Sequence, residues 1–213
     1  MKTLYYNINP DEDFLTDKIK ENILAGKIFA FPTDTVYGLG CIYDNEQSAK
    51  LIYDIKGRDF NKPLVLYLSR VNEIKKYVKS FSIKLELFLK SFMPGGITVI
   101  IEKNELIPDF INSGLSSIGI RIVDNKFLLK LIDALGKPII GTSANLSGQK
   151  SIKDGIHLMD LFNSKIDYIF DMGKSKLQLE STIIVYKENK IKLLRKGIIP
   201  FEKILATFKD IYD

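Results

Sequence analysis

Two neighbouring stretches of this 213-residue chain, PTDTVYGLG at Pro32–Gly40 and IKGRDFNKPL at Ile55–Leu64, place hydroxyl groups, cationic groups and glycines in an otherwise apolar region. In the first stretch, Thr33 and Thr35 lie two residues apart after the apolar run 28–31. Side chains at this spacing in an extended chain project from the same side, so both hydroxyls face one way. The pattern predicts a binding site that begins where a buried strand ends.

The second stretch carries Lys56 and Arg58 at the same spacing. On a continuing helix these two side chains would point in nearly opposite directions. Gly57 between them and the polar run 59–62 predict that the helix ends here, which lets both cations turn toward one anionic ligand. Taken alone, the pair is more typical of a basic helix end favoured by the helix dipole, and the threonine-rich stretch is equally typical of a capped turn.

The composition is that of one globular domain spanning residues 1–213, with 46% hydrophobic and 27% charged residues. A net charge of +5 fits a phosphate-bearing ligand or RNA, but it is also ordinary for a protein surface. The single cysteine, Cys41, excludes a disulfide framework, and the single histidine, His157, argues against a His-rich metal site. Without an apolar signal core or an apolar run near the ~20 residues that span a bilayer, we expect a cytoplasmic protein with no membrane contact.

Hydrophobic periodicity predicts a mixed α/β chain. Helices are expected over residues 11–25, 46–55, 126–135 and 201–212, and strands over 2–6, 28–31, 64–68, 97–101, 118–123, 138–141, 168–170, 181–186 and 191–194. The elements alternate without a fixed repeat, and residues 187–190 are typical of a hairpin turn. A single domain with a twisted, mixed and mostly non-parallel sheet flanked by helices is therefore expected rather than a doubly wound parallel sheet.

Another polar cluster, Ser143-Ala144-Asn145, follows the predicted buried strand 138–141 and precedes Ser151. Small residues around it allow a ligand to approach the backbone closely, and the hydroxyl and amide groups supply donors and acceptors for a phosphate or a ribose. The same stretch is also typical of an ordinary polar loop in which Ser143 caps a helix.

Two arginines complete the set of candidate site residues. Arg121 lies with Ser117 in the apolar run SSIGIRI, so its guanidinium needs either a buried partner or the carboxylate of a ligand. Arg195 accompanies Ser181 near the end of the chain, but it can equally face solvent from an edge strand.

The ordered blocks together resemble the YrdC/Sua5/TsaC family of threonylcarbamoyl-adenylate synthases, and the chain is similar to its short TsaC-type members. The blocks are FPTDTVYGLG at Phe31–Gly40, IKGR with NKPL at Ile55–Leu64, MPGGIT at Met93–Thr98, IGIRI at Ile118–Ile122, TSANLSG at Thr142–Gly148, and ESTII with LLRKGII at Glu180–Ile199. The resemblance implies a YrdC-like domain built around a positively charged cavity.

The resemblance also implies roles for individual residues. The catalytic tetrad of the family falls on Lys56, Arg58, Ser143 and Asn145; ATP would be bound by Arg58, Lys62, Ser117, Ser143, Ser151 and Arg195; and threonine by Thr35, Tyr67, Arg121, Ser181 and the backbone at Gly141. This sequence departs from the family at Gly96 and Val123, where prolines are usual, and at Tyr67, where a histidine is common. A tyrosine can still donate a hydrogen bond, but it does not serve as a base near neutral pH.

The activity implied by the resemblance is the synthesis of threonylcarbamoyl-AMP and pyrophosphate from L-threonine, bicarbonate and ATP, for the t6A37 modification of ANN-decoding tRNAs. Mg²⁺ would come with the ATP phosphates rather than in a protein cage, and a downstream threonylcarbamoyl transferase complex would take the product. Arg121 is the expected partner of the amino-acid carboxylate, because a planar guanidinium matches a carboxylate in two hydrogen bonds.

Two other functions remain open. The basic balance and the 11% aromatic content could serve an RNA-binding module of the same fold, with tRNA or other RNA bound weakly. A carbamoyl-transfer domain like that of hydrogenase-maturation proteins is the second alternative. The chain has no GxxxxGK[ST] phosphate loop, no HExxH and no GxSxG motif.

Overall fold

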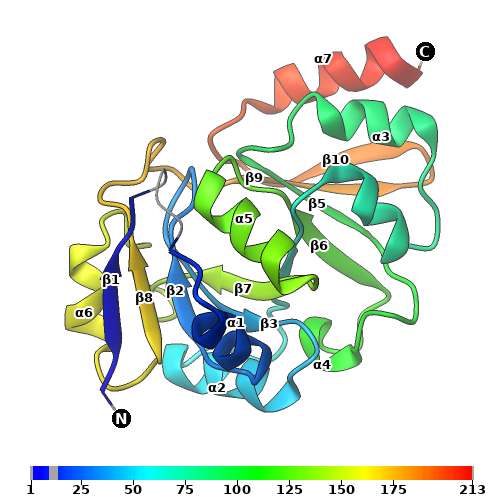
Figure 1. Ribbon diagram of the computed structural model, residues 1–213. Helices are drawn as coiled ribbons and strands as arrows, with labels where there is room; N and C mark the ends of the chain where they lie inside the picture. Colours follow the sequence, from blue (N-terminus) through cyan, green and yellow to red (C-terminus); the bar gives the residue numbers. More distant parts are fainter. Residues whose placement is uncertain (1, 10–13, 213) are drawn as a thin grey trace.

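The computed structural model describes residues 2–9 and 14–212, which form one ten-stranded sheet with helices packed around it (Figure 1). The strand order is β1-β8-β2-β3-β7-β4-β6-β5-β9-β10. The strands are β1 (Leu4–Asn7), β2 (Phe29–Phe31), β3 (Gly38–Ile42), β4 (Val65–Tyr67), β5 (Ile97–Glu102), β6 (Ser117–Arg121), β7 (Ile139–Ser143), β8 (Tyr168–Asp171), β9 (Thr182–Lys187) and β10 (Lys190–Arg195).

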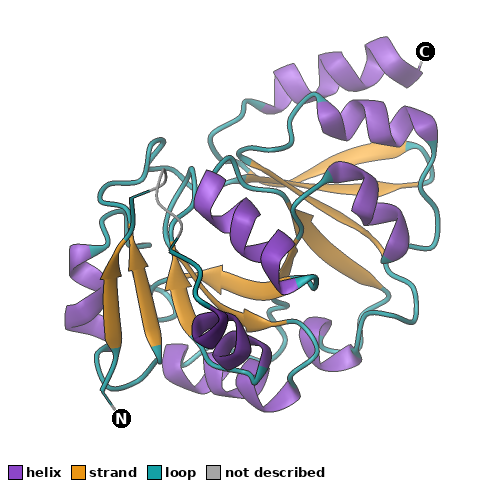
Figure 2. Cartoon of the chain, viewed as in Figure 1, coloured by secondary structure: helices purple, strands orange, loops and turns teal. Residues whose placement is uncertain are grey.

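The helices connect these strands and surround the sheet (Figure 2). They are α1 (Asp17–Leu24), α2 (Glu46–Lys56), the 3₁₀ helix η1 (Val71–Lys76), α3 (Ile83–Lys90), α4 (Asp109–Asn112), α5 (Lys126–Leu135), α6 (Ile156–Phe162) and α7 (Phe201–Tyr212). Asparagine side chains cap two of them at the N-terminus: Asn45 accepts from the Ser48 amide at 2.9 Å, and Asn125 from the Leu128 amide at 3.0 Å. Such caps satisfy amide groups that have no partner within the helix.

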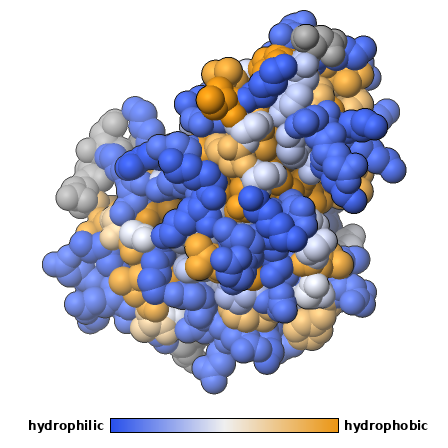
Figure 3. All heavy atoms as spheres, turned by 90° about the vertical axis from the view of Figure 1, so that its right-hand side faces the viewer, coloured by the Kyte–Doolittle hydropathy of each residue, from blue (hydrophilic) through white to orange (hydrophobic). Residues whose placement is uncertain are grey.

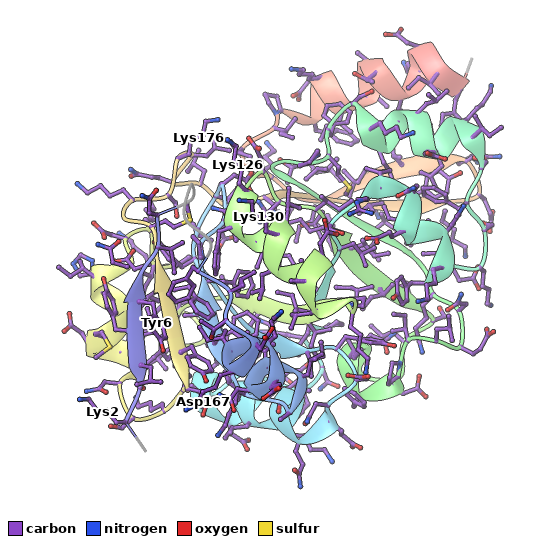
Figure 4. The ribbon with its side chains drawn as sticks, viewed as in Figure 1. Lys2, Tyr6, Lys126, Lys130, Asp167 and Lys176 are labelled. Atoms are coloured by element: carbon purple, nitrogen blue, oxygen red, sulfur yellow. The ribbon has the colours of Figure 1, made fainter. Side chains whose placement is uncertain are left out.

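The core lies on both faces of the sheet, because successive residues of a strand point to opposite sides. In β2, Phe29 and Phe31 pack against α1 and α5, whereas Ala30 belongs to the larger cluster on the other face. Tyr6, labelled in Figure 4, extends the first cluster through contacts with Phe14 and Phe170, at ring centroid distances of 4.8 and 6.1 Å. Each face of the sheet therefore carries its own buried apolar cluster.

The pairing confirms a mixed sheet in which antiparallel neighbours are slightly more numerous. The pairs β2–β3, β3–β7, β4–β7, β5–β6 and β9–β10 are antiparallel, and β1–β8, β2–β8, β4–β6 and β5–β9 are parallel. The expected hairpin turn is confirmed, with Glu188 and Asn189 at positive φ between β9 and β10.

Most predicted elements are present, and several further elements had not been recognised. The helices predicted over 126–135 and 201–212 have the expected bounds, and α2 ends as predicted, with Gly57 in the left-handed conformation at φ 57°. The helix predicted over 11–25 begins at Asp17; its residues 11–13 lie outside the described residues. Strand β3, the 3₁₀ helix η1 and the helices α3 and α4 were not predicted, and no bounds were predicted for α6. Two glycines weaken the strand signal of β3, whereas in the structure Gly40 pairs with Gly141 of β7 and lets the two backbones approach closely.

The far end of the sheet is covered by α3 and α7, which pack together through Phe88 and Phe208 at a ring centroid distance of 5.2 Å. Figure 3 views the molecule from this side, and hydrophobic residues gather in the upper half of this face between hydrophilic ones. Ile83 and Leu87 on α3 are two exposed apolar residues of this region, 77% and 52% exposed. Among the described residues, no helix is long and apolar enough to span a membrane.

Candidate active site

A cavity of about 440 Å³ is lined by residues of strands β3, β4, β5, β6, β7, β9 and β10, together with the loops that follow α2 and β2. Its polar lining is Asn61, Tyr67, Thr98, Ser117, Thr142, Ser143 and Ser181, with the charged residues Arg58, Lys62, Arg121, Glu180 and Arg195; apolar residues such as Val65, Ile100, Ile183 and Leu194 form the remaining wall. The charged side chains come from four separate segments of the chain. The cavity therefore combines a cationic region with an apolar wall.

Eight of the residues singled out in the sequence line this cavity: Arg58, Lys62, Tyr67, Ser117, Arg121, Ser143, Ser181 and Arg195. The other five, which are Thr35, Lys56, Gly141, Asn145 and Ser151, lie behind the lining. Gly141 directly precedes Thr142 in β7, and Ser151 donates to Glu180 at 2.8 Å. The structure thus gathers the predicted residues in one region but divides them into cavity-lining residues and supporting residues.

Lys56 is a supporting residue whose ammonium group holds the loop 143–149. Its Nζ donates to the backbone carbonyls of Ser143 and Asn145, and to Asn145 Oδ1 at 3.2 Å. The bond from the Ser147 amide to the Lys56 carbonyl, at 2.8 Å, ties the same loop to the end of α2. Burial, followed by repulsion from Arg58, lowers the pKa of Lys56 to about 7. Lys56 therefore positions the loop, in contrast to Arg58, which lines the cavity.

Arg58 follows the left-handed Gly57, which turns the chain away from the axis of α2. Its Nε donates to the Lys62 carbonyl at 3.0 Å and its Nη2 to the Pro63 carbonyl at 3.1 Å. These bonds fix the plane of the guanidinium within its own loop. Nη1 makes no hydrogen bond with the residues that the structure describes, so it is available to a ligand.

Ser143 is held from within its loop. Its Oγ donates to Asn145 Oδ1 at 2.6 Å, and Asn145 Nδ2 donates to the carbonyls of Leu146 and Gln149, both at 2.8 Å. Asn145 is buried, so its amide serves the geometry of the loop while Ser143 remains at the cavity wall. The sequence predicted that both side chains offer donors and acceptors to a ligand, whereas in the structure only Ser143 lines the cavity and Asn145 bonds within the loop.

Arg121 forms a buried ion pair with Asp34, which sequence reasoning had missed. Nη2 of Arg121 lies 2.8 Å from Asp34 Oδ1, and the two side chains are 5% and 2% exposed. The available signal was a carboxylate in the otherwise apolar stretch FPTDTVYGLG, because a buried carboxylate needs a cation. Of the two alternatives for Arg121, a buried partner or a ligand, the structure contains the first and leaves part of the guanidinium free for the second.

The hydroxyls of Thr33 and Thr35 face the same way, as predicted, with 3.0 Å between their Oγ1 atoms. Both residues are buried: Thr33 Oγ1 accepts from the Thr35 amide at 3.0 Å and donates to the Val36 carbonyl at 2.6 Å. This network shapes the turn that carries Asp34 and brings Val36 to the cavity wall.

Glu180 is the second carboxylate that sequence reasoning had missed. Its Oε2 lies 2.7 Å from Arg195 Nη1, and its Oε1 accepts from Ser151 at 2.8 Å. Arg195 also donates to the Ser181 carbonyl at 2.9 Å. Glu180 thus holds two residues that the resemblance assigns to ATP, and it does so at the half-exposed rim of the cavity.

Tyr67 lies at the inner wall of the cavity and is fully surrounded by protein, apart from 5% of its surface. Burial raises the pKa of Tyr67, so the phenol stays neutral at physiological pH and keeps its proton. Its hydroxyl group has no hydrogen-bond partner among the described residues, so it can donate a hydrogen bond to a ligand.

Comparison with known proteins gives a consistent result. The family model Sua5/YciO/YrdC, which carries the description "Telomere recombination", matches residues 21–197. A threonylcarbamoyl-AMP synthase of Pyrococcus abyssi is 36% identical over 189 residues, or 89% of this chain. A protein of Methanocaldococcus jannaschii is 36% identical over 200 residues, covering 93% of this chain and 94% of its own length.

A solved structure extends the likeness to three dimensions. The crystal structure of P. abyssi Sua5 complexed with L-threonine matches 97% of this chain with a TM-score of 0.84 and 32% identity. This chain spans 56% of the P. abyssi curated protein and 60% of the crystallised Sua5 chain.

Proposed function

Because the chain belongs to the Sua5/YciO/YrdC family, we propose that it is a nucleotidyltransferase that makes threonylcarbamoyl-AMP and pyrophosphate from L-threonine, bicarbonate and ATP. The observation that carries this proposal is the convergence of Arg58, Lys62, Arg121 and Arg195 on one cavity. ATP, bicarbonate and the carboxylate of threonine are all anionic, and a cavity lined by fixed cations attracts and orients such groups.

The nucleotide occupies the side of the cavity formed by Arg58, Lys62 and Arg195, with Ser117 and Ser143 as further hydrogen-bonding groups. Nη1 of Arg58 makes no hydrogen bond with the described protein, which leaves it available to phosphate oxygens. The Ser151 hydroxyl donates a hydrogen bond to Glu180 Oε1 at 2.8 Å, so it reaches the nucleotide only after this bond breaks.

Threonine occupies the inner side, where Tyr67, Arg121 and Ser181 lie on three different strands or strand ends. Arg121 binds the carboxylate, since a guanidinium can donate two parallel hydrogen bonds to it. Thr35 and the backbone at Gly141 shape this end from behind the lining. The supporting analogy is the P. abyssi Sua5 structure, which was determined with L-threonine.

The proposed reaction needs charge stabilisation more than a covalent nucleophile. The amino nitrogen of threonine first forms a bond to the carbon of bicarbonate and loses a proton while water leaves, which gives N-carboxythreonine. A carboxylate oxygen of N-carboxythreonine then forms a bond to the α-phosphorus of ATP, the bond from that phosphorus to the oxygen bridging to the β-phosphorus breaks, and pyrophosphate leaves with the electron pair. Arg58 and Arg195 stabilise the charge that moves onto the leaving group, while Lys56 and Asn145 keep Ser143 in place.

Mg²⁺ is the ion expected to accompany ATP, but the residues present do not form a protein cage for it. Among the described residues, no group of three or more His, Cys, Asp or Glu could hold a metal ion. Glu180 lines the cavity, yet its two oxygens are engaged by Ser151 and Arg195. The phosphates and water would therefore supply the ligands of the ion.

The proposal extends to the cellular context. We place the reaction in the cytoplasm, carried out by one domain over residues 1–213, with the product consumed by a threonylcarbamoyl transferase complex that modifies A37 of tRNA. The adenylate is a mixed anhydride, so a transferase close at hand would limit its hydrolysis.

The proposal is tested by incubating the pure protein with labelled ATP, threonine and bicarbonate and measuring pyrophosphate and the adenylate by mass. Both products should depend on all three substrates, and omission of threonine is the decisive control. Tight, strongly salt-dependent RNA binding, together with a thermal stability unaffected by ATP and threonine, would instead identify an RNA-binding module.

A further inference from the structure

We infer that Asp34 is a positioning residue that holds the guanidinium of Arg121 in the orientation needed to bind the carboxylate of the amino-acid substrate. This inference rests on the proposed function. Asp34 does not line the main cavity. It affects substrate binding through its ion pair with Arg121, in which Asp34 Oδ1 lies 2.8 Å from Arg121 Nη2.

The two members of the ion pair line different hollows. Arg121 lines the main cavity, whereas Asp34 lines a second hollow of about 520 Å³ that has no lining residue in common with it. The second hollow is bordered by the segment 90–96 and by Lys176, which Figure 4 labels near the beginning of α5. Asp34 therefore contacts Arg121 without lining the main cavity itself.

The hydrogen bonds of Arg121 leave one part of its guanidinium available. A guanidinium has five N–H groups. Nε donates to the Gly95 carbonyl at 3.3 Å and Nη2 donates to Asp34 at 2.8 Å, whereas Nη1 has no hydrogen-bond partner among the described residues. Two anchors at different nitrogens fix the plane of a rigid group. The unused N–H groups can then bind a carboxylate without a further loss of side-chain conformational entropy, because the side chain is already held in one rotamer.

Asp34 is itself held firmly. Its backbone carbonyl accepts from the Leu177 amide at 2.9 Å, and the threonines on either side of it are joined by the bond between their hydroxyls. The turn therefore cannot move without breaking several buried hydrogen bonds, and Asp34 presents a fixed charge to Arg121.

The arrangement is not the one that would best stabilise the fold. Asp34 Oδ2 is buried and has no hydrogen-bond partner among the residues that the structure describes, and Asp34 as a whole is 3% exposed. An unsatisfied buried carboxylate oxygen is costly, and a buried ion pair is often no more stabilising than apolar residues of similar volume. A group retained at such a cost beside a binding cavity is typical of a functional constraint.

The test compares Asp34→Ala, Asp34→Asn and Arg121→Ala, together with the double variant of Asp34→Ala and Arg121→Ala. For each, the Kd of threonine is measured by calorimetry and the KM values of threonine and ATP by pyrophosphate release. We expect Asp34→Ala to weaken threonine binding about tenfold and to change the KM of ATP less than about twofold. Asp34→Asn, which keeps an oxygen that can accept from Nη2, should have a smaller effect.

Non-additivity is the signature of an effect that passes through Arg121. In the Arg121→Ala background, Asp34→Ala should cause no further loss of threonine affinity. Asp124→Asn is the matched control, because Asp124 also lines the second hollow but forms only an exposed ion pair with Lys176 at 3.7 Å; it should leave threonine binding unchanged.

Equal weakening of threonine and ATP, or additive effects in the double variant, would overturn the inference and leave Asp34 with a structural role. If Asp34→Ala does not fold, Asp34→Asn and Arg121→Lys carry the same test with the same criteria. Failure of the proposed function has a different signature, since the unmodified protein would then release no pyrophosphate in response to threonine.

Discussion

Two arginines that line the cavity each pair with a carboxylate, and the two pairs are alike in chemistry but differ in burial. Arg121 and Asp34 lie 2.8 Å apart with side chains that are 5% and 2% exposed, whereas Arg195 and Glu180 lie 2.7 Å apart with both side chains 41% exposed. The distances are nearly equal, so they do not distinguish the two pairs. Burial, rather than distance, therefore determines how much each pair contributes to the free energy of unfolding.

The physical reason is the dielectric environment. At the inner pair, water is excluded, so each charge depends on the other and neither can be removed alone without a large penalty. At the rim pair, solvent and salt screen the attraction, and either side chain can exchange its partner for water or for a phosphate at little cost. The inner pair is suited to a fixed orientation, and the rim pair to a contact that a ligand replaces.

The largest effect is expected from breaking the inner pair on one side. Arg121→Met leaves Asp34 buried without a cation and should lower the free energy of unfolding by about 3–5 kcal/mol. Arg195→Met at the rim should lower it by less than about 1 kcal/mol. Urea denaturation measures both. Equal decreases in the free energy of unfolding for the two variants would contradict the conclusion that the buried pair contributes more to stability than the exposed pair.

Arg58→Ala and Ser143→Ala sharpen the comparison because both residues line the cavity without forming an ion pair. Each should reduce adenylate formation about 100-fold or more, since each removes a group that stabilises charge in the reaction. Stability should change by less than about 1 kcal/mol. Activity is measured as pyrophosphate release and folding by circular dichroism; variants that lose activity by unfolding would count against the assigned roles.

Lys56 provides a third case, a buried cation whose hydrogen-bond partners are carbonyl and amide oxygens. Its pKa is lowered to about 7 in the folded protein, by burial first and then by Arg58. Between this value and the ordinary pKa of lysine, the unfolded chain binds more protons than the folded one, so the free energy of unfolding increases with pH. Relative to Lys56→Met, the unmodified protein should gain about 2 kcal/mol from pH 7 to pH 9.

Denaturant titrations at several pH values measure this gain. A parallel pH dependence in the protein and in Lys56→Met would mean that another group is responsible. Lys79→Met is a suitable control, because Lys79 pairs with Glu102 on the surface, where its side chain is 59% exposed.

The smallest effect is expected at the rim. Glu180→Gln removes a negative charge beside the proposed phosphate site and frees Arg195 and Ser151, so the KM of ATP should decrease about two- to fivefold while the KM of threonine stays constant. An increase in the KM of ATP would mean that Glu180 orients Arg195 for the nucleotide instead of competing with it. In either case a change confined to the KM of ATP would show that the rim pair acts on the nucleotide, in contrast to the inner pair, which acts on threonine.

The candidate site was largely accessible from the sequence, because its residue types are unusual for their surroundings. Ser143, Arg58 and Arg121 were singled out by polar or charged groups in apolar or glycine-rich runs, and all three line the cavity. Asp34 and Glu180 were missed because their importance lies in their partners. Arg121 and Asp34 are 87 residues apart, and Ser151 and Glu180 are 29 apart, so no local pattern joins them.

The amino-acid sequence by itself determined the local features of this protein. Helix α2 stops at Gly57, the bounds of α5 and α7 follow their hydrophobic periodicity, and the two threonine hydroxyls face one way, because these features depend only on neighbouring residues. The tertiary structure alone decided which charges became partners and how deeply each pair is buried. Those outcomes depend on the order of ten strands, which brings distant segments together and excludes water from one arginine but not from the other.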